Sequence, residues 1–432
     1  MPLDIFPSSL PEWARSLASI LPLSTLIEFV DVATQLHVYE LRGSVPHWNW
    51  PVTPSGARLL LSDDDTTGAC LLDLPHRSMK LDCFDGRHGN QYPCSAPTTT
   101  RLWAAKRKVD VLIPNSHGNM KEPTRKQAMR VLHLRDATPG SDAGTGEKTS
   151  GKKLLTYFRT RGLRYLAVSC IGWVCWTGLV VLSFLGGLYI SGPYLLLMPM
   201  MGIVVGFTHG NTARMPQRRD YDAYQRLIIA SGSENGYQWF AFYGDQTLLN
   251  GLLNLPLYRA GSIRFWPFFS NLLRVLIVSQ WGLALGSSAM MGWDAFIIAT
   301  WTTFCILMSA YVYPSNVAAR DWLRRNCQVE VVAIDIELSS RWSMLCAMGT
   351  INPDITNAEA KWMDSILGPT PDRHDVWTTL KEYSLDGDEY DASGVKDKWW
   401  WKFLVEGREV GKSIKRLLEA DIYASAKAKQ TA

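Results

Sequence analysis

No Asp, Glu, Lys or Arg occurs in residues 165–213, YLAVSCIGWVCWTGLVVLSFLGGLYISGPYLLLMPMMGIVVGFTHGNTA. About 20 apolar residues cross a bilayer as one helix, so this stretch is long enough for two crossings. Near its middle, Ser191-Gly192-Pro193 is a turn signal. The stretch therefore predicts one helix over residues 165–190, a second over 194–211, and a transmembrane hairpin over 161–213.

A buried helical hairpin inside a soluble protein is the alternative. Helices of soluble proteins usually keep a polar stripe, and Ile171–Ile190 has none. We therefore favour insertion into a membrane.

A second apolar pair follows later in the chain. Val275–Trp293 carries no charge, Asp294 interrupts, and Ala295–Ala319 is again uncharged. This predicts a second transmembrane hairpin over 265–319. The expected fold class is an α-helical integral membrane protein with four transmembrane helices in two hairpins and cytosolic α/β parts at both ends.

The flanks of these helices predict the orientation. Basic residues gather before and after each pair, and the turns between paired helices carry no Lys or Arg. Cytoplasmic flanks are rich in Lys and Arg, so both termini and the central segment are expected in the cytosol, with the endoplasmic reticulum as the default membrane. The flanking residues are Lys152, Lys153, Arg159, Arg161, Arg164, Arg214, Arg218, Arg219, Arg264, Arg274, Arg320, Arg324 and Arg325.

Composition excludes several protein classes. Lys and Arg total 44 against 40 Asp and Glu, an excess of only 4 among 432 residues, so bulk charge excludes a basic nucleic-acid binder. Eight cysteines are too few for a disulfide scaffold. Membrane lipids are therefore expected partners, and nucleic acid is not.

Residues 1–136 predict a cytosolic α/β or β-rich domain, followed by a flexible basic linker over 137–160. Pro11–Val32 has the apolar spacing of a helix, either in the core or on the membrane surface. Five short apolar runs predict strands: Gln35–Leu41, Arg58–Leu61, Cys70–Leu74, Val109–Ile113 and Arg130–Leu134.

The remaining segments, 214–264 and 320–432, are also expected in the cytosol. Asp220–Tyr224 begins a predicted amphipathic helix, and the aromatic run 236–247 suits the membrane interface. In the C-terminal domain Val329–Leu338 alternates like a strand. The three tryptophans of residues 399–401 predict either an interfacial anchor or packing on the N-terminal domain.

Candidate catalytic residues gather around the cytosolic end of the first hairpin. His209 ends the second predicted helix, and an imidazole at a membrane mouth can act as a general acid or base. Asp220, Asp222 and Asp245 belong to the adjoining segment, and aromatic side chains there would hold an apolar substrate. These four residues are the predicted catalytic site, with no cofactor and no metal expected.

Other motifs do not indicate a metal-binding or catalytic site. Cys70, His76, Cys83, His88 and Cys94 are zinc-ligand types, but their spacing lacks the close pairs of structural zinc sites. Gly202–Gly206 and Gly282–Gly286 are GxxxG motifs that favour close helix packing. The absence of charge in mid-span weighs against a pump or coupled transporter.

The paired helices around the aromatic segment Tyr237–Asn250 resemble a group of ascomycete membrane proteins, some encoded in gene clusters for decahydrofluorene compounds of the pyrrocidine type. The resemblance covers residues 160–325 and transfers no catalytic residue. It implies a membrane-bound component of fungal secondary metabolism that acts on or presents a lipophilic intermediate, with a cyclisation as one candidate step. The partners it implies are other biosynthetic enzymes and a lipophilic small molecule. The alternatives are a non-enzymatic scaffold for partner enzymes and a channel or transporter.

Overall fold

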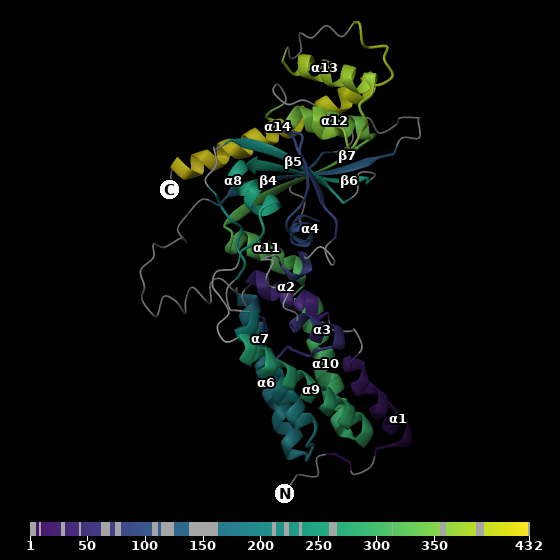
Figure 1. The fold of residues 1–432 in the computed structure, drawn as a ribbon, viewed down its shortest axis with the longest axis vertical. Coiled ribbons are helices and arrows are strands. Elements are labelled where there is room, and N and C mark those ends of the chain that lie inside the picture. Colours follow the sequence, from purple (N-terminus) through teal and green to yellow (C-terminus); the bar gives the residue numbers. More distant parts are fainter. Residues whose placement is uncertain are drawn as a thin grey trace. The chain divides into compact units, whose positions relative to one another are not determined.

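The computed structural model describes residues 6–7, 10–26, 31–42, 45–61, 70–73, 79–105, 111–113, 125–137, 163–209, 213–219, 224–232, 236–258, 266–312, 314–354, 360–385 and 393–430. The chain forms two compact units, each built from three segments (Figure 1). Unit 1 contains residues 1–74, 146–215 and 258–326, and unit 2 contains residues 75–145, 216–257 and 327–432. The expected N-terminal domain 1–136 is therefore divided between the two units.

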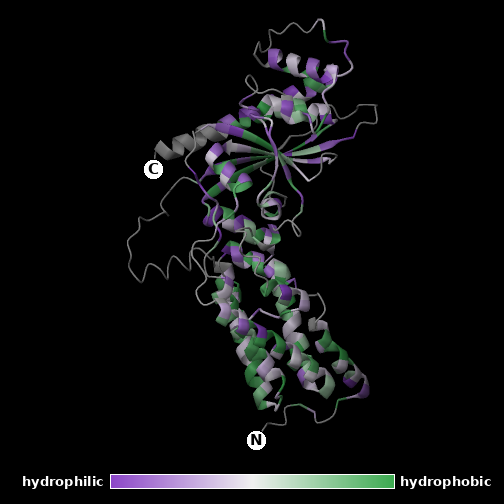
Figure 2. Ribbon diagram, viewed as in Figure 1, coloured by the Kyte–Doolittle hydropathy of each residue, from purple (hydrophilic) through white to green (hydrophobic). Residues whose placement is uncertain are grey.

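Unit 1 contains the predicted apolar helices. They are α6 (Leu163–Leu185), α7 (Ser191–His209), α9 (Trp266–Met290) and α10 (Trp293–Leu307), which continues as the π-helical turn η5 (Met308–Val312). In the described residues these four helices are long and apolar enough to span a membrane. The two predicted helical pairs are confirmed (Figure 2).

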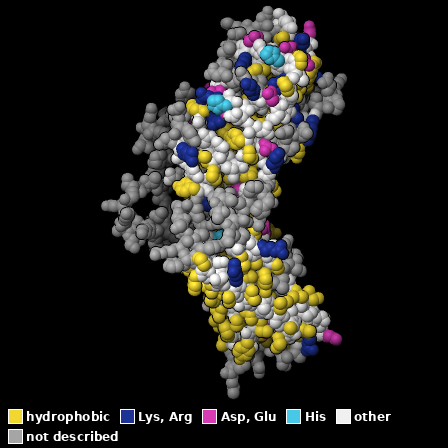
Figure 3. Space-filling model, viewed as in Figure 1, with side chains coloured by type: hydrophobic (Ala, Val, Ile, Leu, Met, Phe, Trp, Pro, Cys, Tyr) yellow, Lys and Arg dark blue, Asp and Glu magenta, His cyan; other side chains and the backbone are white. Residues whose placement is uncertain are grey.

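The surface of unit 1 is apolar where a soluble protein would be polar. Only 11% of the apolar window of α6 is buried, against 67% of that of α7, which therefore lies at the centre of the helices. Large apolar side chains such as Val174, Phe207 and Val278 are more than half exposed, and hydrophobic side chains cover the described helices in Figure 3. Exposed apolar patches of this extent mark a surface that meets lipid or another protein.

The charge that interrupts the second apolar pair has a structural role. Asp294, in the first turn of α10, accepts hydrogen bonds from the backbone N–H groups of Ile190 (3.1 Å) and Ser191 (2.7 Å). The first N–H groups of a helix have no partner within it. Asp294 therefore caps α7 and joins the turns of the two hairpins.

The N-terminal residues reach these same turns. The ring of Phe6 lies 5.3 Å from that of Trp293, and the indole N–H of Trp293 donates to the carbonyl of Pro7 at 3.2 Å. From there α1 (Glu12–Ile20) and the 3₁₀ helix η1 (Leu21–Leu26) pack against α9 and α10. The predicted helix over Pro11–Val32 thus ends at Ile20, and α1 leaves Trp13, Leu17 and Ile20 exposed.

Three of the predicted strands are wrong. Gln35–Leu41 lies inside α2 (Val32–Arg42), Arg58–Leu61 overlaps α3 (Pro54–Leu60), and Cys70–Leu74 contains the 3₁₀ turn η3 (Leu71–Asp73). Short apolar runs fit a buried helix as well as a strand. Thr53 caps α3 by accepting from the Gly56 N–H at 3.2 Å.

Between α2 and α3, residues 45–53 form a loop that enters the helical bundle, which we call the inserted loop. Trp48 and Trp50 have no exposed surface. The indole N–H of Trp48 donates to the Ser169 carbonyl in α6 at 3.2 Å, and the Gln280 side chain of α9 accepts from the Val52 N–H at 3.1 Å. Non-helical backbone at membrane depth requires such burial within protein.

The two GxxxG motifs differ in what they contact. A Cβ on Gly202 would lie 2.4 Å from the His47 carbonyl oxygen, whereas Cβ atoms on Gly282 and Gly286 would meet nothing within 4 Å among the described residues. Gly202 therefore makes room for the inserted loop, and the second motif makes no close contact there.

Unit 2 is built on a mixed sheet with the strand order β2-β1-β5-β6-β4-β7-β3. Its strands are β1 (Asp82–Asp85), β2 (Gln91–Pro93), β3 (Val111–Ile113), β4 (Gln127–Asp136), β5 (Gln225–Ser231), β6 (Gln238–Asp245) and β7 (Val329–Leu338). The predicted strand Val329–Leu338 is confirmed, Arg130–Leu134 lies within β4, and Val109–Ile113 overlaps β3. All three chain segments of unit 2 supply strands to this one sheet.

One face of the sheet is covered by two helices of the C-terminal segment, α12 (Arg341–Ile351) and α14 (Trp401–Gln430), and α13 (Pro371–Leu385) packs on these two helices. Trp239 and Ala241 pack in this core, and Phe242, with the opposite parity in β6, packs its ring against Trp103 of α4 (Pro97–Ala105). Alternation along a strand places successive side chains on opposite faces.

The aromatic run 236–247 is thus the core strand β6 followed by the start of α8 (Gln246–Leu249), which corrects its assignment to the membrane interface. Its aromatic rings fill the two faces of the sheet. Likewise Trp400 is buried in the unit 2 core and Trp401 stacks on Tyr383 at 5.9 Å, while Trp399 is 52% exposed. Packing within unit 2 accounts for two of the three tryptophans.

Candidate functional site

The predicted catalytic residues that the structure describes lie in different local environments. His209 is the last residue of α7 in unit 1 and is half-buried. Asp245 ends β6 in unit 2 and caps α8, accepting from the Thr247 N–H at 2.8 Å. Asp220 and Asp222 lie outside the described residues. The carboxylate of Asp245 is therefore occupied in holding a helix end.

A different group of charged residues comes together in unit 2, which we call the polar cluster: Asp85, Arg87, Arg226, Asn250 and Asp354. Asp85 ends β1, Arg87 lies in the β1–β2 turn, and Arg226 is near the start of β5. Asn250 begins the π-helical turn η4 (Asn250–Asn254), a geometry that is frequent at functional sites. Asp354 follows α12.

The centre of the polar cluster is a buried ion pair. Asp85 has no exposed surface, and Arg226 holds it with two hydrogen bonds, from Nε at 3.0 Å and from a terminal nitrogen at 2.8 Å. The other terminal nitrogen of Arg226 donates to the Asn250 side chain at 3.1 Å. Asp85 also accepts from the backbone N–H groups of Arg87 and His88.

These contacts set the charge of Asp85. Burial by itself raises the pKa of this carboxyl, but hydrogen bonding to Arg226 and its charge outweigh burial and leave the pKa below its ordinary value. The same pairing leaves the pKa of Arg226 raised, although burial lowers it. Both groups are charged at neutral pH.

Asp354 is the member of the polar cluster suited to move a proton. Burial raises the pKa of Asp354, and the charge of Arg87, whose Nε lies 3.7 Å from Oδ1, opposes the shift. Its Oδ2 is buried and has no hydrogen-bond partner within the described part of the chain. A carboxyl with a raised pKa beside fixed cations is a candidate general acid or base.

No protein-family model, curated protein or solved structure matches this chain. A function is therefore inferred from the residues of this chain alone. The polar cluster combines a carboxyl with a raised pKa, two guanidinium groups and an amide, a set that can bind an anionic or carbonyl oxygen and exchange a proton with it.

The Tyr92 hydroxyl adds a polar atom beside the polar cluster. It is buried, and the structure shows no hydrogen-bond partner for it among the described residues. Burial, followed by the nearby Cys83, raises the pKa of Tyr92, so the phenol is neutral. A hydrogen bond with Cys94, and then burial, raise the pKa of the Cys83 thiol.

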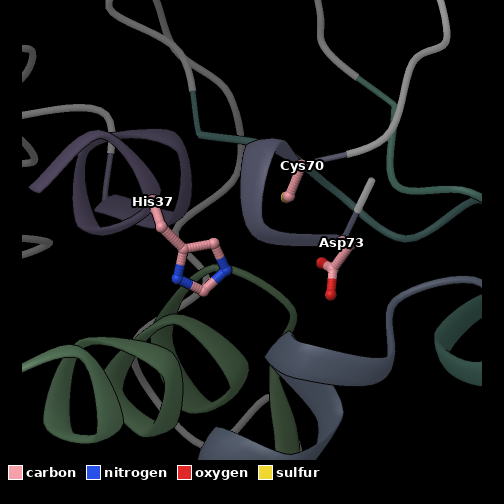
Figure 4. A group of neighbouring side chains, drawn as sticks. All are labelled: His37, Cys70 and Asp73. Carbon is pink, nitrogen blue, oxygen red and sulfur yellow. The ribbon is translucent and has the colours of Figure 1, made fainter. Parts of the chain in front are cut away.

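Unit 1 contains a separate group of potential metal ligands: His37 of α2, with Cys70 and Asp73 at η3. One ligand atom from each residue lies within 4.8 Å of the other two, and all three residues are buried. In Figure 4 one ring nitrogen of His37 points toward Cys70 and Asp73 and the other points away. Burial, and then the charge of Arg214, lower the pKa of His37 to about 4, so the imidazole is neutral at pH 7.

The zinc-ligand types considered from the sequence are distributed differently. Cys70 belongs to unit 1, whereas Cys83 and Cys94 belong to unit 2 and contact each other. His88 is exposed, and His76 lies outside the described residues. His37 and Asp73 were not predicted as ligands, because both lie in segments that were assigned to strands and His37 is 33 residues from Cys70.

Proposed function

We propose that this protein is a multi-pass integral membrane protein that acts on or presents a lipophilic small molecule at the membrane surface, as a component of fungal secondary metabolism. The observation that carries its membrane location is the apolar surface of unit 1, where only 11% of the apolar window of α6 is buried. Exposure of that surface to water would oppose folding at about 25 cal/mol per Å², and lipid removes this penalty.

The connectivity of the sheet supports two hairpins that each return the chain to its starting side. Along the chain, β4 comes before α6, β6 comes after α7 and before α9, and β7 comes after α10. Strands that pair in one sheet must lie on the same side of a membrane. Since the flanks that adjoin unit 2 are basic, we place unit 2 and the C-terminus in the cytosol, with the endoplasmic reticulum as the proposed membrane.

The contacts of Phe6 and Pro7 support a different side for the N-terminus than the sequence predicted. Both residues contact Trp293 at the turn between α9 and α10, at the helix ends opposite to those that lead to unit 2. We therefore propose that residues 6–7 lie on the non-cytosolic side and that α1 and η1 bring the chain back along α9 and α10.

A glycosylation acceptor tests this topology. An Asn-x-Thr acceptor on a flexible spacer ahead of Met1 should be glycosylated in a eukaryotic host, because only the lumenal side carries the glycosylation machinery. The same acceptor after Ala432 should stay unmodified. An unmodified N-terminal tag, with a lumenal reporter protein glycosylated normally, would restore the cytosolic N-terminus that the sequence predicted.

We assign the chemical role to the polar cluster, with Asp354 as the proton-transferring group and the partly exposed Arg87 as the anchor for an oxygen of the substrate. The raised pKa of Asp354 supports this assignment, because burial favours the protonated form of this carboxyl. His209 and Asp245 remain predictions from the sequence, and Asp245 has its capping role instead.

Deletion of the gene should remove one family of compounds from the metabolite extract and accumulate a less cyclised precursor. Re-introduction of Asp354→Asn should leave the product about 100-fold lower, the usual contribution of a general acid or base. The matched control is Asp136→Asn, an exposed carboxylate of unit 2 paired with Arg218, which should restore the product fully. Mass spectrometry of the extracts, with immunoblots for protein level, measures both.

The scaffold is the second candidate, and the position of the aromatic run favours it. Since Trp239 and Phe242 are buried in β6, Tyr237 is the aromatic side chain of this segment that is more than half exposed. A scaffold predicts that deletion abolishes the product while Asp354→Asn restores it. An unchanged metabolite profile after deletion would contradict both candidates.

A further inference from the structure

We propose that His37, Cys70 and Asp73 bind a zinc ion in unit 1. This inference goes beyond the function proposed above and is independent of the polar cluster. It rests on the convergence of three ligand types on one point between α2 and η3 (Figure 4).

The geometry is close to that of a zinc site. Zinc binds nitrogen, sulfur and carboxylate oxygen at about 2.0–2.3 Å, so two tetrahedral ligands lie roughly 3.3–3.8 Å apart. The three ligand atoms already lie within 4.8 Å of one another. Coordination therefore requires the ligand atoms to approach one another by at most about 1.0–1.5 Å.

The direction of the imidazole distinguishes a metal site from a catalytic Cys-His-Asp triad. In a triad the nucleophile and the carboxylate contact opposite nitrogens of the ring. Here the same ring nitrogen of His37 points toward both Cys70 and Asp73 (Figure 4). Convergence of all three groups on one point is the arrangement that a shared cation requires.

The donor set and its burial favour zinc among the divalent metals. A thiolate and an imidazole suit zinc, whereas Mg²⁺ and Ca²⁺ prefer oxygen ligands throughout. Cys70 and Asp73 are at most 5% exposed and His37 is fully buried. A thiolate and a carboxylate together neutralise a divalent cation, so the occupied site is uncharged overall and suited to a buried position.

Among the described residues three side chains meet at this point, so three of the four positions of a tetrahedral zinc ion are assigned.

Metal analysis of the full chain, purified in detergent from zinc-supplemented cells, tests the site. We expect about one zinc per chain, as measured by mass spectrometry of the metal. Cys70→Ser and Asp73→Asn should each weaken zinc binding at least 10-fold, since even loss of an outer-shell partner costs about 10–100-fold. Cys346→Ala is the matched control, because this buried thiol lies in unit 2 and should leave the zinc content unchanged.

Cobalt substitution gives a second readout. With Co²⁺ in place of zinc, a thiolate-to-cobalt absorption band should appear in the wild type and in Cys346→Ala, and should be absent from Cys70→Ser. A wild-type protein that binds neither metal would overturn the proposal, as would variants that retain full zinc content. Because metal content is measured without any metabolite, its failure is distinguishable from failure of the proposed function.

Discussion

Replacement of Asp85 by asparagine is expected to destabilise unit 2 by about 3–5 kcal/mol, the usual effect of removing one partner of a buried ion pair. Asp85 is fully buried, and its partner Arg226 has a side chain only 10% exposed. The asparagine would keep one acceptor oxygen for Arg226, but it would leave the guanidinium charge in the interior without its counter-charge. Most of the effect is the cost of that uncompensated charge.

Thiol labelling of the full chain in detergent measures this loss. Cys83 and Cys94 are buried near the ion pair, so they react only when the structure opens, and peptide mass spectrometry resolves each cysteine. Labelling in the variant should be faster by about two to three orders of magnitude, because each 1.4 kcal/mol is about tenfold.

The matched control is Arg135→Gln, which removes an ion pair with the half-exposed Glu330 and should cost at most about 1 kcal/mol. Equal labelling rates in the control and in Asp85→Asn would show that the buried pair does not hold unit 2 together. The double variant Asp85→Leu/Arg226→Met should be less destabilised than Asp85→Asn, because it buries no charge.

The effect of Asp85→Asn should also depend on pH. Because the pKa of Asp85 is lowered in the folded protein, its ionised form adds stability that is complete above the pKa of an unfolded carboxyl, about 3.9. This stability is lost as the pH falls through the lower folded value. The difference between wild type and variant should therefore shrink below about pH 4, and a constant difference would assign the effect to packing.

Trp48→Ala is expected to destabilise unit 1 by about 3–5 kcal/mol, the range for removing a buried tryptophan. Trp48 has no exposed surface, its ring lies 5.6 Å from those of Trp301 and Phe304, and it donates to the Ser169 carbonyl. Its removal would leave a cavity where the inserted loop meets α6 and α10.

Cys305 is the reporter for this variant, because its buried thiol contacts the Trp48 carbonyl at 3.9 Å. Its labelling should be faster by two orders of magnitude or more, at about tenfold per 1.4 kcal/mol. The control Trp13→Ala removes a side chain that is 67% exposed and should change stability by no more than about 0.5 kcal/mol. A similar effect of both replacements would mean that the inserted loop is not packed inside the bundle.

The sequence predicted the elements whose pattern is long or strictly alternating. Residues 165–213 have no charge and enough length for two crossings, and α6 and α7 follow from that alone. Val329–Leu338 alternates over ten residues and forms β7 over the same bounds. In contrast, Gln35–Leu41 was wrongly predicted as a strand. A run of only seven residues that mixes apolar and polar side chains fits a helix as well as a strand.

The candidate sites could not be predicted from local patterns in the sequence. The polar cluster takes residues from the β1–β2 turn, β5, η4 and the segment after α12, so no motif in the sequence links Asp85 with Arg226 or Asp354. His37 is 33 residues from Cys70 in the sequence, and the position of helix α2 in the fold places the two side chains close together. The predicted residues His209 and Asp245 were chosen by nearness along the chain, which does not specify nearness in space.

The sequence by itself determined which segments are apolar enough to enter a membrane, because the free energy of transfer into lipid is a sum over the residues of one helix. It also determined the alternation of β7. Only the tertiary structure decided that residues 45–53 enter the bundle, that the aromatic run is a core strand, and which charged side chains meet. Those outcomes depend on contacts between distant segments, where burial of a charge or a backbone group is favourable only once its partner is in place.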